Sequence, residues 1–232
     1  RSYSDVLRCV THFFVQNEAS RELLARKGIT NVTVAGDTRF DRVLDICRQA
    51  KDLSLVKAFK QDAKVLVAGS SWAPDEDLII PYFNAHPEMK LVLAPHVVSE
   101  DHLKEIEGKL RRPFARYSRV TEESAARADC LIIDGYGLLS SIYRYGEMAY
   151  VPEAAVYGVP VLIGPNNRKF REAQDLLREG GCLEVTDADT FTRTMDRLLS
   201  DGKFLAERGR IAGQYIERNA GASDLIFDSV KF

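Results

Sequence analysis

Long apolar runs are missing from this sequence, and so are the cysteine patterns of metal and disulfide sites. No stretch approaches the ~18 apolar residues of a membrane-spanning helix. The four cysteines, Cys9, Cys47, Cys130 and Cys182, form no CxxC pair and no Cys/His cluster. This spacing argues against a zinc site and favours buried free thiols in a reducing compartment.

Neither sign of charge dominates. Lys and Arg number 32 and Asp and Glu number 34, so the formal net charge is −2. Such a balance gives no general attraction to nucleic acid. The 232 residues suffice for one large domain or two small ones. The chain starts without Met and shows no signal peptide, and we expect it to be a soluble piece of a longer protein.

The usual signatures of a complete active site are also missing. The sequence holds no Walker A loop and no GxGxxG. It has no Ser/His/Asp or Cys/His arrangement, and no carboxylate pair suited to general acid and base work. We therefore expect no catalytic residue, no metal and no cofactor in this chain. It is more typical of the part of an enzyme that holds a ligand.

Short apolar runs rich in β-branched residues alternate with helical patterns along the chain. Near-continuous apolar strands belong to parallel sheets that are covered on both faces, and helices between them indicate βαβ units. The pattern predicts a doubly wound, Rossmann-like α/β fold. The expected strands are 13–16, 32–35, 65–68, 91–94, 130–133, 149–151 and 161–163.

The first 55 residues differ from the rest of the chain. They hold two weak strands and a helix over 41–51, after which the lysine-rich stretch 51–64 leads to a new strand at Val65. We expect residues 1–55 to end one domain and connect it to a main domain at 56–215. Residues 216–232 would form a tail that packs back towards the first domain.

Ligands of open parallel sheets bind beyond the carboxyl ends of the strands, and polar turns follow several expected strands here. After 65–68 comes "GSSWAPDED", where Gly69, Ser70 and Ser71 offer amides and hydroxyls to an anion; an ordinary strand-to-helix turn explains the stretch equally well. His96 follows the strand 91–94 and would face the same cleft, although a lone His is more often structural.

Two further turns have the same ambiguity. In "DGYGLLSS", Gly135 and Gly137 could let backbone amides hold a phosphate oxygen, or could simply make a tight turn. Glu153 in "VPEAA" could gain ~0.3–1 kcal/mol from the start of a short helix, or could accept hydrogen bonds from the two hydroxyls of a ribose. We expect Trp72 to pack in the interior and the Arg-rich stretch 111–119 to be a solvated loop.

Four blocks, taken in order, carry a resemblance to a known family. They are "FFVQNEASRELLARKGITNVTVAGDTRFDRV", "VLVAGSSWAPDED", "LAPH" and "EAAVYGVPVLIGPNNRKFREA". The sequence resembles the Kdo (3-deoxy-D-manno-octulosonic acid) transferases, glycosyltransferases of lipopolysaccharide biosynthesis with a GT-B fold. The resemblance spans residues ~10–200, and the first block with its "GDTRFD" argues against other GT-B enzymes, such as UDP-sugar transferases. A non-catalytic nucleotide-binding module is a further alternative.

The resemblance implies a chain that corresponds to the C-terminal half of the GT-B fold. Residues 1–55 would then end the N-terminal acceptor domain, and 56–215 would bind the donor CMP-Kdo. Kdo would pass, without a metal, to a lipid A precursor at the cytoplasmic face of the bacterial inner membrane. The absent N-terminal domain would contact that acceptor and the membrane.

The family's motifs map onto four turns of this sequence. Its Pro-basic pair corresponds to Pro95 and His96, and its serine-bearing turn to Gly69, Ser70 and Ser71. Its Met-Gly-Glu turn corresponds to Tyr136, Gly137 and Leu138, a departure at two of three positions. Its ribose-binding Glu corresponds to Glu153. All nine residues are therefore expected to bind CMP.

One departure concerns the chain in front of Glu153. The family has a glycine-rich loop and an Asn there, whereas Val151 here is followed directly by Pro152. Either the loop has been deleted or the printed sequence omits a segment. We favour the second explanation, because a strand needs a turn before a helix can begin and Pro152 biases Val151 towards extended geometry.

A transfer assay tests the assignment of the missing base. The family's general base is a Glu of the N-terminal domain, so this chain alone should transfer no Kdo from CMP-Kdo to a lipid A precursor. Turnover in that assay would contradict the expectation.

Overall fold

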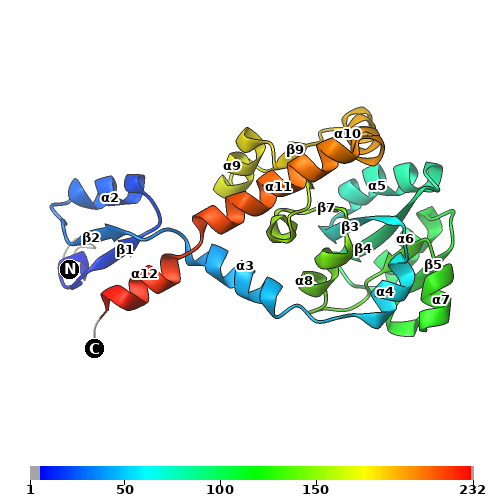
Figure 1. Ribbon diagram of the computed structural model, residues 1–232, viewed down its shortest axis with the longest axis horizontal. Coiled ribbons are helices and arrows are strands. Elements are labelled where there is room, and N and C mark those ends of the chain that lie inside the picture. Colours follow the sequence, from blue (N-terminus) through cyan, green and yellow to red (C-terminus); the bar gives the residue numbers. More distant parts are fainter. Residues whose placement is uncertain (1–5, 231–232) are drawn as a thin grey trace. The chain divides into compact units, whose positions relative to one another are not determined.

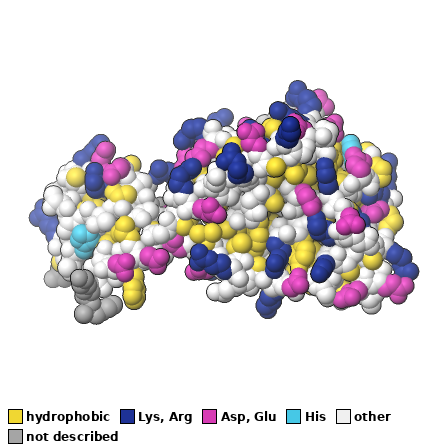
Figure 2. All heavy atoms as spheres, in the orientation of Figure 1, with side chains coloured by type: hydrophobic (Ala, Val, Ile, Leu, Met, Phe, Trp, Pro, Cys, Tyr) yellow, Lys and Arg dark blue, Asp and Glu magenta, His cyan; other side chains and the backbone are white. Residues whose placement is uncertain are grey.

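The computed structural model describes residues 6–230, which divide into two compact units (Figure 1). The smaller unit combines the first segment, up to Arg48, with the last, from Ile216. The larger unit comprises Gln49–Tyr215. In Figure 2, acidic and basic side chains alternate over the surface in view, and neither sign forms a continuous region.

The smaller unit contains a two-stranded parallel sheet. Strand β1 (Phe13–Val15) pairs with β2 (Val32–Val34), and helix α2 (Glu18–Ala25) lies between them in sequence. Helix α2 is capped by Asn17, whose side chain accepts a hydrogen bond from the Ser20 amide at 2.9 Å. This cap satisfies one of the amides that a helix start leaves without a partner.

The "GDTRFD" stretch is hydrogen-bonded to the start of the last helix of the chain. Helix α3 (Thr38–Arg48) carries Asp41, and the final helix α12 (Ala222–Ser229) begins beside it. The Asp41 carboxylate accepts from the backbone amides of Gly221 and Ser223, the latter at 2.8 Å. Burial opposes ionisation of Asp41, but these amides outweigh it and hold the Asp41 pKa below its ordinary value. Asp41 therefore supplies the cap that the start of α12 lacks.

The larger unit is built on a seven-stranded sheet in the order β5-β6-β4-β3-β7-β8-β9. Every neighbouring pair is parallel, so all carboxyl ends lie at one edge. The order changes direction at β3, where β4 lies on one side and β7 on the other. The strands are β3 (Lys64–Ser71), β4 (Met89–Pro95), β5 (Phe114–Arg116), β6 (Cys130–Ile132), β7 (Met148–Tyr150), β8 (Val161–Ile163) and β9 (Cys182–Glu184).

Alternate residues of the central strands enter two separate cores. Leu66 and Ala68 face one core, and Val65 and Val67 face the other. The first core receives α5 (Ala73–Ala85), α6 (Glu100–Lys109) and α10 (Ala188–Ser200). The second receives α4 (Ser54–Lys60), α7 (Glu122–Arg127), α8 (Leu139–Ile142) and the 3₁₀ helices η2 (Tyr143–Tyr145) and η3 (Pro152–Tyr157). The expected doubly wound α/β fold is thus confirmed.

The remaining elements are α9 (Arg171–Glu179), α11 (Gly202–Asn219) and η1 (Tyr117–Arg119). Two of the helix ends carry recognisable local signals. Ser99 caps α6 by accepting from the His102 amide at 3.3 Å, and α9 ends at Gly180, whose φ is 87°. Within residues 6–230, no helix has the length and apolar character needed to cross a membrane.

Several elements were not predicted from the sequence. The lysine-rich stretch before β3 contains α4, because Val56 and Phe59 are fully buried while Lys60 pairs with Glu147. The expectation of a solvated loop at 111–119 is wrong. This stretch holds edge strand β5, and the Arg116 side chain is only 6% exposed because it pairs with Glu100 at 2.7 Å and Glu107 at 2.6 Å.

Helix α11 approaches the backbone beyond η3 through glycine. A Cβ added to Gly209 would collide with the carbonyl oxygen of Gly158, whereas one added to Gly108 in α6 meets nothing within 4 Å. Because the obstacle is backbone, Gly209→Ala should lower the free energy of unfolding by about 1–3 kcal/mol. Gly108→Ala should raise it by about 0.5–1 kcal/mol. Urea unfolding of both variants measures the contrast, and equal effects would contradict this packing.

Candidate functional site

The candidate site is the carboxyl edge of the sheet, where the chain leaves five neighbouring strands. In the order β6-β4-β3-β7-β8, these ends lead into the turns that the sequence marked as polar or glycine-rich. Ligands of doubly wound sheets bind where the strand order reverses, which here is at β3 and β7. The fold therefore brings Gly69–Ser71 to the centre, with His96 on one side and Glu153 on the other.

The turn after β3 has an unusual backbone. Pairing with β4 shifts register between Gly69 and Ser71, and the intervening Ser70 has φ 53° although it is not glycine. A left-handed conformation costs an ordinary residue about 1–2 kcal/mol. The Ser70 side chain is exposed while Gly69 and Ser71 are buried. The bulge thus turns one serine outwards at the centre of the candidate site.

The expected burial of Trp72 is wrong. Its side chain is 54% exposed, and its indole stacks on the imidazole of His96 with ring centroids 4.2 Å apart and an interplanar angle of 26°. His96 itself is exposed and its amide donates to the Ser71 carbonyl at 2.8 Å. Pro95, one residue earlier, is buried as the last residue of β4. An aromatic pair therefore stands at the ends of β3 and β4.

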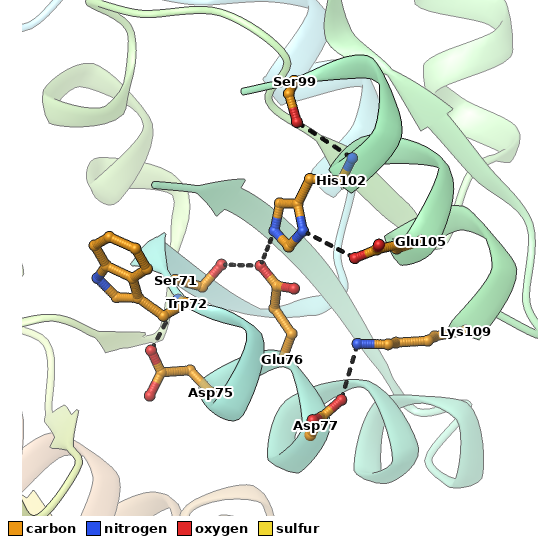
Figure 3. Close-up of polar contacts among 9 residues, drawn as sticks. All are labelled: Ser71, Trp72, Asp75, Glu76, Asp77, Ser99, His102, Glu105 and Lys109. Atoms are coloured by element: carbon orange, nitrogen blue, oxygen red, sulfur yellow. Dashed lines mark hydrogen bonds and ion pairs between the residues drawn. The ribbon is translucent and has the colours of Figure 1, made fainter. Parts of the chain in front are cut away.

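A hydrogen-bond chain connects this pair to β7. Asp75 in the first turn of α5 accepts from the Trp72 amide at 2.9 Å (Figure 3) and from the hydroxyl of Tyr150, the last residue of β7, at 2.9 Å. Burial and the Asp75 carboxylate raise the pKa of Tyr150 above its ordinary value. Tyr150 therefore remains a neutral donor at physiological pH. Through Asp75, the backbone amide of Trp72, which follows β3, is also linked to the end of β7.

Glu153 is exposed in the first turn of η3. Its charge acts on Tyr143: burial, and then the Glu153 carboxylate, raise the pKa of that phenol. The Tyr143 hydroxyl in turn occupies the space beside Gly69, where any Cβ would collide with it. Gly69 is therefore needed for close packing, and Tyr143 links the turns after β3 and β7.

A single residue makes the junction in front of Glu153, and the omission of a segment there stays a prediction. Strand β7 ends at Tyr150, η3 begins at Pro152, and Val151 alone makes the change with φ 176° and ψ 139°. The Ala154 amide donates back to the Val151 carbonyl at 3.3 Å. One extended residue is enough, because a 3₁₀ helix with Pro at its first position needs no amide there.

The turn after β6 contributes an exposed aromatic residue. Tyr136 is 80% exposed, Gly137 has φ 84°, and Leu138 is half-buried at the start of α8. The preceding Asp134 accepts from the amide and hydroxyl of Ser118, the former at 2.9 Å. The positive φ of Gly137 bends the chain here, and Tyr136 is exposed at this edge.

Asn167, after β8, has a structural role. It is buried, and its amide nitrogen donates to the Gly164 carbonyl at 2.8 Å and to Glu184 of β9 at 2.7 Å. This holds the turn over the end of β8. Across the described part of the chain, no group of three His, Cys, Asp or Glu residues is placed to hold a metal ion.

Comparison with known proteins supports the resemblance seen in the sequence. No protein-family profile matches the chain. The chain is 26% identical over 211 residues to a 3-deoxy-D-manno-octulosonic acid transferase of Aquifex aeolicus, a match that covers 82% of this chain and 55% of the relative. The chain thus spans about half the length of that protein. The resemblance to Kdo transferases is confirmed.

Solved structures confirm the fold. The C-terminal CMP-Kdo binding domain of WaaA from Acinetobacter baumannii superposes with a TM-score of 0.62 at 19% identity, covering 76% of this chain and 99% of that domain. A UDP-GlcNAc 2-epimerase from Neisseria meningitidis gives a TM-score of 0.66 at 18% identity, covering 91% of this chain and 58% of the epimerase. The chain has the architecture of one half of a GT-B fold.

Removing the backbone strain at Ser70 by substitution tests the geometry of the turn after β3. Ser70→Gly should raise the free energy of unfolding by about 1 kcal/mol, because glycine adopts positive φ without a Cβ clash. Ser70→Ala keeps that clash and serves as the control, with no gain expected. Urea midpoints measure both variants, and equal midpoints would show that Ser70 is not strained.

Proposed function

We propose that this chain supplies the part of a Kdo transferase that binds CMP-Kdo, for transfer of Kdo to a lipid A precursor in lipopolysaccharide biosynthesis. The observation that carries the proposal is the placement of two exposed, chemically opposite side chains, His96 and Glu153, on either side of the exposed Ser70. They leave β4 and β7, the two neighbours of β3. With strands about 4.8 Å apart, their strand ends lie about 10 Å from each other, so one nucleotide can meet both.

Each side chain suits a different part of a nucleoside monophosphate. The Glu153 carboxylate accepts hydrogen bonds only, which matches the paired hydroxyls of a ribose. His96 and the hydroxyl and amide of Ser70 offer donors to a phosphate. The relative and the structural neighbour that carry Kdo in their names support CMP-Kdo as the donor.

We assign the remaining expected contacts to the same edge. Pro95 fixes the start of the His96 turn, Gly69 and Ser71 shape the turn around Ser70, and Tyr136, Gly137 and Leu138 border the nucleotide from β6. The donor domain would comprise residues 56–215. We assign the lipid A precursor and the cytoplasmic face of the inner membrane to the part of the relatives that this chain does not span.

A second candidate is the donor half of an enzyme that uses a UDP-sugar. The TM-score with the UDP-GlcNAc 2-epimerase favours it. The two functions differ in the base and in the number of phosphates, so nucleotide preference separates them. Tighter binding of UDP or UMP than of CMP would favour the second candidate.

Calorimetry with CMP, UMP and UDP tests the proposal. We expect CMP to bind most tightly, and Glu153→Gln to weaken it about tenfold, since a hydrogen bond to a charged group contributes about 1.5–3 kcal/mol. Glu123→Gln is the matched control, because Glu123 is an exposed carboxylate on α7 that pairs with Arg127 at 3.1 Å, away from the edge. Failure of all three nucleotides to bind would contradict a donor site and leave Glu153 a surface charge.

A further inference from the structure

A buried carboxylate lies directly behind the turn after β3. Glu76 in the first turn of α5 is 0% exposed, and Figure 3 shows its side chain between Ser71 and His102. Its Oε1 accepts from the Ser71 hydroxyl at 3.1 Å and lies 3.1 Å from His102 Nε2. Its Oε2 has no hydrogen-bond partner among the described residues. Through this one oxygen, Glu76 of α5 contacts both the end of β3 and helix α6.

Burial of the Glu76 carboxylate in this way lowers the stability of the fold. Burial of a carboxylate is unfavourable unless every oxygen is hydrogen-bonded, and an unpaired buried group costs about 1–3 kcal/mol. Apolar side chains of similar size at such positions are often neutral or stabilising. Stability alone therefore does not account for a carboxylate at position 76. The contacts of its one hydrogen-bonded oxygen indicate its role.

That oxygen fixes the centre of the candidate site. Its partner Ser71 follows the strained Ser70 and precedes the exposed Trp72. The Ser71 carbonyl accepts from the amide of His96, on which Trp72 stacks. A hydrogen bond that restrains the Ser71 side chain therefore also restrains the backbone of Ser70 and Trp72. Through the Ser71 carbonyl, it restrains His96 as well.

His102 holds Glu76 from α6. Its Nε2 donates to Glu76, and its Nδ1 lies 3.4 Å from the Glu105 carboxylate. The His102 side chain is only 15% exposed, whereas Glu105 is 67% exposed. The neighbouring pair Lys109–Asp77, at 2.8 Å, also joins α6 to α5 but lies at the surface. Of these contacts, only the one from His102 reaches the buried carboxylate.

We propose that Glu76, held by His102, is a positioning residue for the donor nucleotide: it sets the turn that presents Ser70, Trp72 and His96. The ligand in this inference rests on the function proposed above, whereas the effect on the turn does not. Trp72 is the single tryptophan of the chain, so its near-ultraviolet circular dichroism and its emission report the geometry of this turn without any ligand.

The experiment compares three variants of Glu76 and its neighbour. Glu76→Ala should change the Trp72 spectra and weaken CMP binding about tenfold, because the turn loses its hydrogen bond. Glu76→Gln should restore most of both, since the amide oxygen still accepts from Ser71. Asp77→Ala removes the adjacent exposed carboxylate of the same helix and should leave spectra and affinity unchanged.

Each outcome decides the proposal. A folded Glu76→Ala with unchanged Trp72 spectra, or with changed spectra and unchanged CMP affinity, overturns it. So does a Glu76→Gln variant as impaired as Glu76→Ala. If Glu76→Ala does not fold, Ser71→Ala removes the same hydrogen bond from the turn side, and unchanged spectra there overturn the proposal. If the unaltered chain binds no CMP, the proposed function and the donor part of this inference fail, and the spectra alone decide whether Glu76 sets the turn.

Discussion

The parallel alignment of seven strands is the constraint on which the larger unit depends. Because both faces of such a sheet must be covered, each strand alternates residues between two cores, as Leu66 and Val67 do. Helices then have to return the chain to the same end of the sheet after every strand. The polar turns, far apart in sequence, meet at one edge for this reason alone. The candidate site is a product of topology before it is a product of particular side chains.

Much of this could be predicted from the sequence. The buried central strands are apolar runs of β-branched residues, so β3 and β4 are recognisable wherever they occur, and the polar residues after them mark the edge. Caps such as Ser99 and the glycine after α9 are equally local signals. The short outer elements gave no such signal. Strand β5 contains the charged Arg116, which is buried only because Glu100 and Glu107 of the preceding helix α6 neutralise it.

The site's finer geometry depends on contacts that no local pattern encodes. The left-handed conformation of Ser70 follows from a register shift between β3 and β4. The residues around Ser70 do not predict this shift. The stacking of Trp72 on His96 joins residues that follow two different strands, β3 and β4. In the sequence, Glu76 is one of several acidic residues near the start of a helix. Its burial depends on α6, whose position over α5 is a tertiary fact.

The single-residue passage at Val151 has a consequence for how such a scaffold can diversify. The backbone leaves β7 and enters η3 at the rim, and the sheet pairing of β7 is complete by Tyr150. Extra residues placed at this junction would break no ladder hydrogen bond and displace no fully buried side chain. Segments of different length can therefore be accommodated at this junction while the sheet stays the same. Proteins built on this frame can vary the chain at this rim without changing how they fold.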